Sequence, residues 1–170
     1  MMFGIDLGMN IASVIYIAGR KVAYVKVFNF KSYKDIPESK RFSTIAADLN
    51  RAVVTAGMVG DVCIEEPIYS WGRKNPKGFA KSCMLFALLR FFLEENGFKV
   101  HPVNNKSAKK MAGHGSKDKL AMIKAFEKRT GKRYNGPQYA KETVADSYFI
   151  AEYGRMMHGV GTKKDPTRKG

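Results

Sequence analysis

Cysteine is scarce in this sequence, and long apolar runs are absent from it. The only two cysteines are Cys63 and Cys83, and no Cys-x-x-Cys spacing exists. Neither a zinc knuckle nor a disulfide framework is therefore expected, and a reducing compartment suits the chain. No segment approaches the length that spans a bilayer, and the first residues lack the basic and apolar regions of a signal peptide. We therefore expect a soluble, cytoplasmic protein with no membrane partner.

Acidic residues are few relative to basic ones. Fifteen Asp and Glu face thirty Lys and Arg, which leaves a formal net charge of +15 at pH 7. Such a field attracts polyanions, so nucleic acid is the leading class of partner, although a merely soluble basic protein would have the same balance. The length of 170 residues is enough for one domain with its own core. We expect a single domain over residues 1–158 and a basic, flexible tail over 159–170.

The hydrophobic pattern predicts a meander of strands followed by alternating helices and strands. Strands are predicted over 2–7, 11–17, 22–30, 61–65 and 98–103. Helical spacing predicts a first helix that Ser43 or Thr44 caps and Gly57 ends. Further helices are predicted over 79–95 and 142–157, with a basic helical region in 104–133. The order β-β-β-α-β-α-β-α is typical of an α/β fold in which helices flank a mixed five-stranded sheet.

Acidic residues lie where the predicted elements end or meet. Asp6 ends the first strand, Glu65 ends the fourth, and Asp146 lies on the last helix with Glu142 four residues before it on the same face. Carboxylates crowded at one rim repel one another by about 1 kcal/mol per close pair even in water, and a divalent cation relieves this repulsion. Each acid alone also has a structural explanation, as a turn cap, a surface ion pair or a helix-dipole contact.

The chemistry of this acidic set favours particular metals. Oxygen ligands without His or Cys suit Mg²⁺ or Mn²⁺ rather than zinc. Two such ions can hold both the attacking water and the leaving oxygen in phosphodiester hydrolysis. The set therefore predicts a site for two Mg²⁺ or Mn²⁺ ions at which Asp6 is a primary ligand.

Four stretches of the sequence, FGIDLGMNIASVIYI, VCIEEP, GHGSKDKLAMIKAF and ETVADSYFIAEY, follow one another in this order. Together they resemble the RuvC-type Holliday junction resolvases of the ribonuclease H-like nuclease superfamily, particularly the small versions of phages and poxviruses. The resemblance covers most of residues 2–153. It implies a ribonuclease H-like fold and a metal-dependent endonuclease that resolves four-way and other branched DNA by paired symmetric nicks. It also implies the cytoplasm of a bacterial host if the gene is viral.

The resemblance implies roles for individual acids. Asp6, Glu65 and Asp146 match the first, second and last metal ligands of the family, with Glu66 as a competitor of Glu65. The family's usual partner of the last acid lies three residues before it, where this chain has Thr143. Glu142 is the natural substitute, so the fourth ligand stays open between these two positions.

The resemblance also implies a catalytic lysine and DNA contacts. Lys119, in SKDKLA, matches a basic residue that the family uses beside the scissile phosphate, where an ammonium stabilises the growing negative charge. Lys117 is a second candidate, and a solvated first helical turn is the alternative for both. Phosphate contacts are expected from Lys106, Lys109, Lys110, Lys117 and Lys119, and from a second patch of Arg73, Lys74 and Lys77. Tyr69 and Trp71 are expected to stack on an unpaired base, with packing against the next helix as the alternative for either.

The approximate two-fold symmetry of a four-way junction favours a homodimer. The helix over 79–95 is apolar on almost every side, which predicts that it is sandwiched or lies in a subunit contact. Its apolar residues are Met84, Leu85, Leu88, Leu89, Phe91 and Phe92. Two other functions stay open: a ribonuclease H that acts on RNA:DNA hybrids, and a branched-DNA-binding protein without catalysis.

Overall fold

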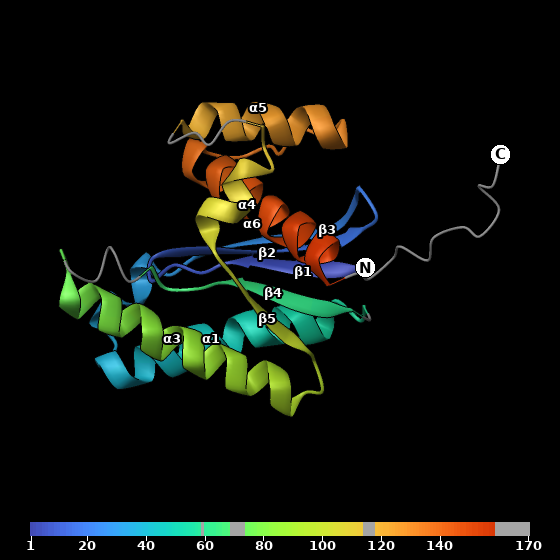
Figure 1. Cartoon of the computed structure of the whole chain (residues 1–170). Coiled ribbons are helices and arrows are strands. Elements are labelled where there is room, and N and C mark those ends of the chain that lie inside the picture. The colour runs from blue at the N-terminus through green and yellow to red at the C-terminus, as the bar shows by residue number, and fades with distance from the viewer. Residues whose placement is uncertain (59, 69–73, 114–117, 159–170) are drawn as a thin grey trace, which may run out of the picture.

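The computed structural model describes residues 1–58, 60–68, 74–113 and 118–158, in which a mixed five-stranded sheet lies between two layers of helices (Figure 1). The strands are β1 (Met2–Asp6), β2 (Ile11–Ala18), β3 (Lys21–Asn29), β4 (Asp61–Glu65) and β5 (Val100–Val103). Their order in the sheet is β3-β2-β1-β4-β5. The first three strands form the predicted antiparallel meander, whereas β1 pairs with β4 and β4 with β5 in parallel.

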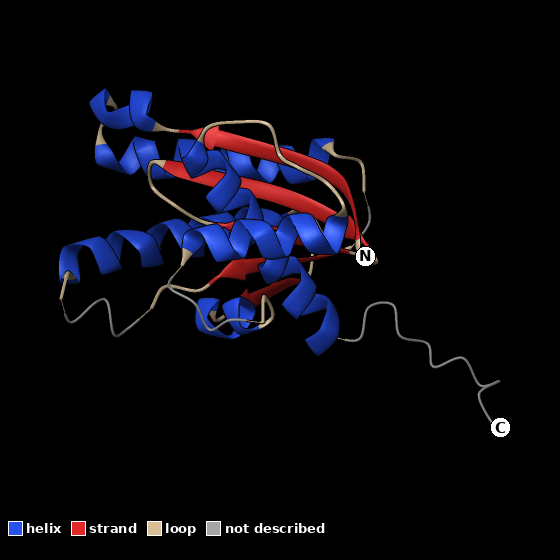
Figure 2. Cartoon of the chain, turned by 90° about the horizontal axis from the view of Figure 1, so that it is seen from above, coloured by secondary structure: helices blue, strands red, loops and turns tan. Residues whose placement is uncertain are grey.

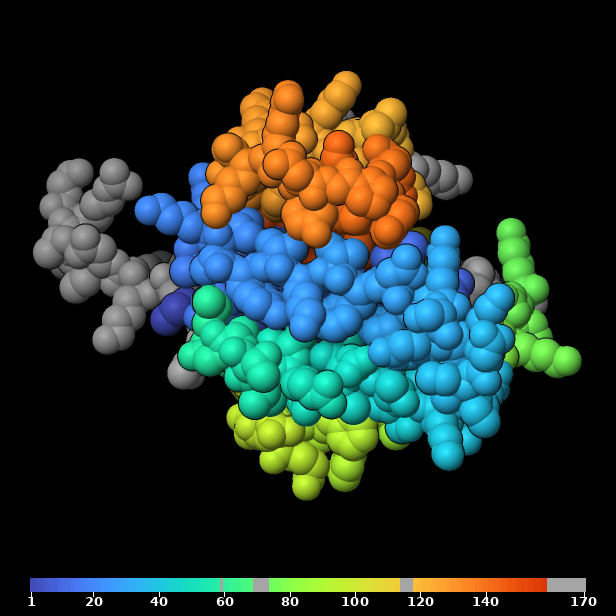
Figure 3. Space-filling model, turned by 180° about the vertical axis from the view of Figure 1, so that it is seen from behind, coloured from blue at the N-terminus to red at the C-terminus, as the bar shows by residue number. Residues whose placement is uncertain are grey.

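Helices cover both faces of this sheet. They are η1 (Lys31–Asp35), α1 (Glu38–Thr55), α3 (Pro76–Glu95), α4 (Asn105–Lys110), α5 (Lys119–Thr130) and α6 (Gln138–Met157). Figure 1 shows α1 and α3 on one face and α4, α5 and α6 on the other, and Figure 2 shows helices overlying the strands. From behind, Figure 3 shows the blue band of the meander between the orange helical layer and the cyan one. The prediction of a mixed five-stranded sheet with flanking helices is therefore confirmed.

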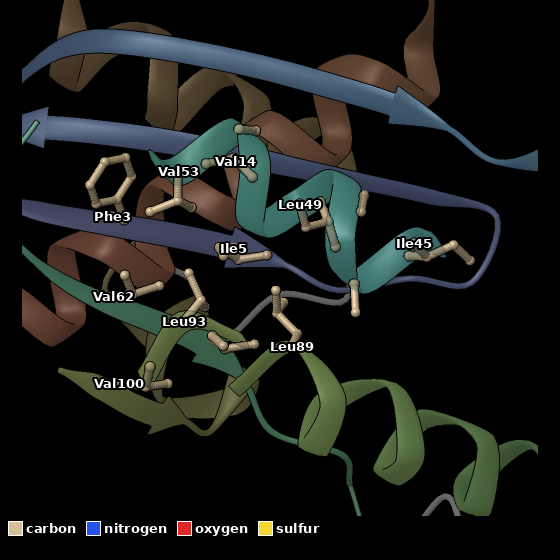
Figure 4. Close-up of a cluster of buried hydrophobic side chains, with 14 of the residues drawn as sticks. Phe3, Ile5, Val14, Ile45, Leu49, Val53, Val62, Leu89, Leu93 and Val100 are labelled. Carbon is tan, nitrogen blue, oxygen red and sulfur yellow. The ribbon is translucent and has the colours of Figure 1, made fainter. Parts of the chain in front are cut away.

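The alternation of β1 gives each face of the sheet its own core. Phe3 and Ile5 point to the side of α1 and α3, where they pack with Leu49 and Leu89 (Figure 4). Met2 belongs to the opposite cluster, against α6. Successive strand residues point to opposite faces, so a strand buried on both sides has to be apolar throughout. Full burial of one such large side chain contributes about 1.5–3 kcal/mol.

Two glycines allow α6 to approach the sheet closely. A Cβ on Gly4 of β1 would lie 2.1 Å from the carbonyl oxygen of Ser147, and a Cβ on Gly154 would lie 2.0 Å from Sγ of Cys63. A larger side chain at Gly4 would require a shift of the backbone of α6, and one at Gly154 would require the side chain of Cys63 to move. This close packing holds the middle of α6 beside the end of β1, which decides where the candidate site forms.

The predicted starts of the helices are wrong, and prolines explain the error. The helix predicted from Ser43 or Thr44 begins at Glu38, directly after Pro37, and both hydroxyls bond back to the carbonyl of Lys40 instead of capping. The helices predicted from residues 79 and 142 begin at 76 and 138. Pro76 is the first residue of α3, where its fixed φ suits the helix and its missing N–H has no intrahelical partner. Pro37 and Pro137 are the residues directly before α1 and α6, with ψ of 139° and 160° outside the helical range.

The apolar helix α3 is not sandwiched. Leu85, Leu89 and Leu93 are buried against the sheet, whereas Met84 and Phe91 are 52% and 56% exposed on the other side. The second prediction for this helix, a subunit contact, therefore remains for its outer face. Among the described residues no helix has the length and apolar character to cross a membrane. The predicted tail over 159–170 lies outside the described residues.

Candidate active site

Asp6 and Glu65 end two neighbouring parallel strands. Ile5 pairs with Ile64, so the next residue of each strand, Asp6 and Glu65, lies beside the other. Their carboxyl groups are close enough to share a hydrogen bond. Burial raises the pKa of Asp6 well above its ordinary value, and the negative charge of Glu65 raises it further. The ionised form of Asp6 is therefore unfavourable unless a cation lies beside it, and without a cation the protonated form is favoured.

A set of buried hydroxyl groups holds Asp6 from the side of α6. The hydroxyl of Thr143 donates a hydrogen bond to Oδ2 of Asp6, and the backbone N–H of Asp6 donates to Oγ of Ser147 at 3.2 Å. Ser13 on β2 donates to the carbonyl of Thr143 at 2.9 Å and contacts the hydroxyl of Ser147. Sequence reasoning missed Ser13 and Ser147. The signals were a serine inside an otherwise apolar strand and the four-residue spacing of Thr143 and Ser147.

Asp146 faces the same rim from α6. Its Oδ1 lies 3.8 Å from Nζ of Lys109, a residue of α4. Burial raises the pKa of Asp146 to about 7, and the charge of Asp6 adds to this effect, whereas Lys109 and Lys119 oppose it. The structure thus brings three of the predicted acids to one rim, together with an ammonium group that balances part of their charge.

Glu142 and Lys119 form an ion pair at the mouth of this rim. Nζ of Lys119 lies 2.6 Å from Oε2 of Glu142, and the amide of Gln138 donates to the other carboxylate oxygen at 3.2 Å. The hydrogen bond from Lys119 lowers the pKa of Glu142, and the same bond raises the pKa of Lys119. Both groups therefore stay charged at neutral pH.

The acids open into a depression of about 180 Å³. It is lined by Asp6, Ile11, Lys119, Tyr139, Glu142, Thr143 and Asp146. A second hollow, of about 210 Å³, begins at Glu65 and continues between the ends of β1 and β4 and α3. The carboxylates thus lie between two hollows that open at the same edge of the sheet.

The structure distinguishes Glu65 from Glu66. Only Glu65 contributes to the raised pKa of Asp6, and its Oε1 accepts a hydrogen bond from the side-chain amide of Asn105. Glu66 accepts a hydrogen bond from Asn104 at 3.2 Å instead. Both asparagines follow β5, whose end lies beside the end of β4, and sequence reasoning missed them. The signal was a pair of amides directly after a strand of the parallel half of the sheet.

The remaining predicted DNA contacts are placed unequally. Lys106 and Lys110 are exposed on α4, and Lys74 and Lys77 are exposed at the start of α3. The predicted residues Tyr69, Trp71, Arg73 and Lys117 lie outside the described residues. The part of the basic surface that the structure describes therefore consists of two groups of lysines, one on each side of the strand ends.

At this rim, lysine side chains pair with two of the acids that are expected to bind a metal ion. Within the described ranges, no three Asp, Glu, His or Cys side chains are arranged to hold a metal ion. Asp146 is turned toward Lys109, and Glu142 is turned toward Lys119. The donor set is nevertheless one that hard divalent ions prefer, because every predicted ligand is a carboxylate oxygen. An ion would have to compete with the two ammonium groups for Asp146 and Glu142.

Solved structures share this fold. The structure of Thermus thermophilus RuvC matches with a TM-score of 0.68 and 19% identity over 92% of this chain and 96% of the other. T. thermophilus RuvC in complex with a Holliday junction substrate matches with 0.70 and 18% over 95% and 96%. The yeast mitochondrial Holliday junction resolvase Ydc2 matches with 0.62 and 18% over 89% and 76%. No protein-family model matches the sequence, and no curated protein sequence is similar to it. The prediction of a ribonuclease H-like, RuvC-type fold is confirmed.

Proposed function

We propose that this chain is a divalent-metal-dependent endonuclease that resolves four-way DNA junctions. One observation carries the proposal: Asp6, Glu65 and Asp146 meet at one rim of the sheet, in a chain that has the fold of RuvC. One of the matching structures is described with a Holliday junction substrate, and another is described as a Holliday junction resolvase. The net charge of +15 supports a polyanionic substrate.

The carboxylates fit Mg²⁺ or Mn²⁺, with two ions per site. Burial and mutual repulsion raise the pKa of both Asp6 and Asp146, so a divalent cation would lower the free energy of the ionised site. Asp6, Glu65 and Asp146 would hold the ions, and Glu142 would supply the fourth carboxylate. When bound, such ions activate water and stabilise negative charge on the phosphate.

The chain's own residues would then divide the remaining work. Thr143 and Ser147 fix the orientation of Asp6, and Asn105 fixes that of Glu65. Hydrolysis forms a bond from the water oxygen to phosphorus and breaks the bond from phosphorus to the leaving sugar oxygen. Lys119 would stabilise the charge that grows on the phosphate oxygens, once Glu142 has turned from it toward the metal.

The basic surface would hold the junction arms. Lys106, Lys109, Lys110, Lys74 and Lys77 would contact backbone phosphates and would give affinity without sequence information. The same role is proposed for Arg73 and Lys117, which lie outside the described residues. Tyr69 and Trp71 would stack on bases near the crossover. We further propose one domain over 1–158 and a location in the cytoplasm, that of a bacterial host for a viral gene.

We also propose a homodimer that forms through α3. Exposed residues recur on its outer face with the spacing of four, three and four that two packed helices share: Ala80, Met84, Ala87 and Phe91. Small residues alternate with large ones, which suits the interdigitation of two copies. A two-fold dimer would present two identical sites to the opposed strands of a junction.

Cleavage of a labelled synthetic four-way junction tests the proposed function. The reaction is compared with duplex and RNA:DNA hybrid controls, in Mg²⁺, in Mn²⁺ and in chelator. Paired symmetric nicks that require a metal are expected only in the junction. Cleavage of the hybrid alone would assign the chain to the ribonuclease H activity instead, and binding without cleavage in either ion would assign it to a non-catalytic role.

A further inference from the structure

A basic pocket lies at the end of the sheet opposite to the carboxylates. It has a volume of about 490 Å³ and is lined by Arg20, Ala112, Ala125, Lys128 and Arg129. Arg20 belongs to the turn between β2 and β3, whereas Asp6 lies opposite Ser13 near the start of β2. Figure 1 shows this turn and α5 on the same side of the sheet plane as α6. The pocket is therefore separate from the candidate active site.

One arginine of the pocket is held rigidly. Arg129 donates to the carbonyl of Met111, lies 3.8 Å from Oε1 of Glu152, and has its guanidinium carbon 5.5 Å from the ring centre of Phe149. Arg155 also binds Glu152, at 3.1 Å. Because one buried carboxylate is shared by two arginines, this group keeps a net positive charge.

Arg20 and Lys128 add positive charge that nothing in the described residues neutralises. Both side chains are exposed, and neither forms an ion pair within the part of the chain that the structure describes. The buried hydroxyl of Tyr148 on α6 has no hydrogen-bond partner among the described residues, but Tyr148 does not line the pocket. Burial raises the pKa of Tyr148, while Arg129 and Arg20 act to lower it, so its hydroxyl is within electrostatic reach of both. The pocket combines one arginine that is held by several contacts with two exposed cations.

The lining also indicates what kind of anion fits. As far as the described residues line it, the pocket has two alanines and three cations, with no aromatic ring and no side-chain amide that would hold a nucleobase. A phosphate group needs only cations and N–H or O–H donors. The pocket is therefore suited to a phosphate without its base, as in the backbone of a duplex.

The distance from the candidate active site matches a position along a DNA arm. Lys119 and Lys128 are nine residues apart on α5, which corresponds to a rise of about 14 Å. Ser13 and Arg20 are seven residues apart along β2 and its turn, which corresponds to at most about 23 Å. At about 3.4 Å per base pair, this range corresponds to roughly four to seven base pairs.

We propose that this pocket binds a backbone phosphate of a duplex arm about four to seven base pairs from the point of cleavage. The inference rests on the proposed function, because the arm is that of the junction the chain cuts. The pocket would fix the direction in which the arm leaves the active site. It would raise affinity for junctions with long arms without reading their sequence.

Neutral phosphate analogues test this inference directly. Single methylphosphonates are placed at successive positions along an arm, and junction binding is measured in chelator so that the strands stay intact. The unmodified chain is expected to lose affinity about threefold to tenfold at one or two positions in the stated window. The double variant Arg20→Ala/Lys128→Ala is expected to bind the unmodified junction more weakly and to show a smaller loss in that window, because only Arg129 remains. Its slope of log affinity against log salt is expected to fall by about one to two.

A second double variant controls for net charge. Lys34→Ala/Lys99→Ala removes the same charge from two exposed positions away from the pocket and is expected to keep the methylphosphonate effect. The proposed phosphate site would be overturned if the methylphosphonates reduced affinity equally in both double variants, or if they had no effect on the parent chain within the window. Failure of the proposed function gives a different result, since the parent chain would then leave an unmodified junction uncut in Mg²⁺, whether or not it binds that junction.

Discussion

The ammonium of Lys119 lies 2.6 Å from Oε2 of Glu142, so a candidate phosphate-stabilising lysine is held by a candidate metal ligand. Their hydrogen bond raises the pKa of Lys119 and lowers the pKa of Glu142, which keeps both charged. Neither group can take up its proposed role while it is paired with the other. Metal binding at Glu142 would therefore release Lys119 toward the substrate.

This pair predicts different effects for its two members. Lys119→Met is expected to reduce the single-turnover cleavage rate at saturating metal about 10²- to 10³-fold. It is also expected to lower the half-saturating Mg²⁺ concentration, because the ammonium that competes for Glu142 is removed. Glu142→Gln is expected to raise the half-saturating Mg²⁺ concentration about tenfold or more. Metal titrations of the cleavage rate separate these outcomes, with Lys99→Met as a control at an exposed lysine elsewhere. An unchanged rate for Lys119→Met would remove this residue from the chemistry.

Thr143 is predicted to tune the protonation of Asp6. Its hydrogen bond lowers the pKa of Asp6, against the larger effect of burial. Thr143→Val keeps the shape of the side chain and removes the donor, so the pKa of Asp6 is expected to rise. The pH at which cleavage is half-maximal should then move upward. Thr55→Val, at an exposed threonine of α1, should leave the profile unchanged, and an identical profile for Thr143→Val would contradict the assignment.

Asp146 is predicted to lower the stability of the metal-free protein at neutral pH. Its pKa is about 7 in the fold and near 3.8 when unfolded, so the folded state binds the proton more tightly. The stabilisation present in acid is therefore lost as pH rises from about 4 to about 7. In chelator, Asp146→Asn is expected to match the parent most closely near pH 4 and to exceed it by about 1–3 kcal/mol at pH 8.

Thermal unfolding at these two pH values checks the prediction, with Asp35→Asn as a control at an exposed acid. Added Mg²⁺ should reduce the difference at pH 8, because only the parent keeps the carboxylate. Equal stability of variant and parent at both pH values would contradict the prediction, because it would show that ionisation of Asp146 does not destabilise the fold.

The outer face of α3 is predicted to hold the dimer together. Met84→Glu and Phe91→Glu place charges on residues that are 52% and 56% exposed in one copy. Each is expected to convert a dimer into a folded monomer, because a charge is costly at the centre of an apolar contact. Sedimentation velocity measures the state, and Val54→Glu on α1 is the control at an apolar residue that is 41% exposed. A monomeric parent would contradict the proposed contact.

The central strands β1, β2 and β4 could be predicted from the sequence because their apolar runs are dictated by burial on both faces of the sheet. The starts of α1, α3 and α6 could not, since hydrophobic spacing fades in the exposed first turn. The residues that set those starts, Pro37, Pro76 and Pro137, are easily taken for loop residues. A proline before a helical pattern marks the start of a helix as well as the end of a loop.

The acids of the site could be predicted from their positions because strand order brings Asp6 and Glu65 to one rim. The choice between Glu65 and Glu66 could not be derived from alternation alone, since the ladder of β4 ends at Glu65 and local alternation no longer constrains the next residue. The supporting hydroxyls of Ser13 and Ser147 depend on the close approach of α6 at Gly4, which is a tertiary contact without a local sequence pattern.

The most direct test of the central claim is the effect of Asp6→Asn on binding and on cleavage of the same four-way junction. Binding is measured in chelator and cleavage in Mg²⁺. We predict that the variant binds at least as tightly as the parent, because one negative charge is removed from the DNA-facing rim, and that its cleavage rate falls by about 10³-fold or more. Cleavage by Asp6→Asn at the parental rate would contradict the assignment of this rim as the catalytic metal site.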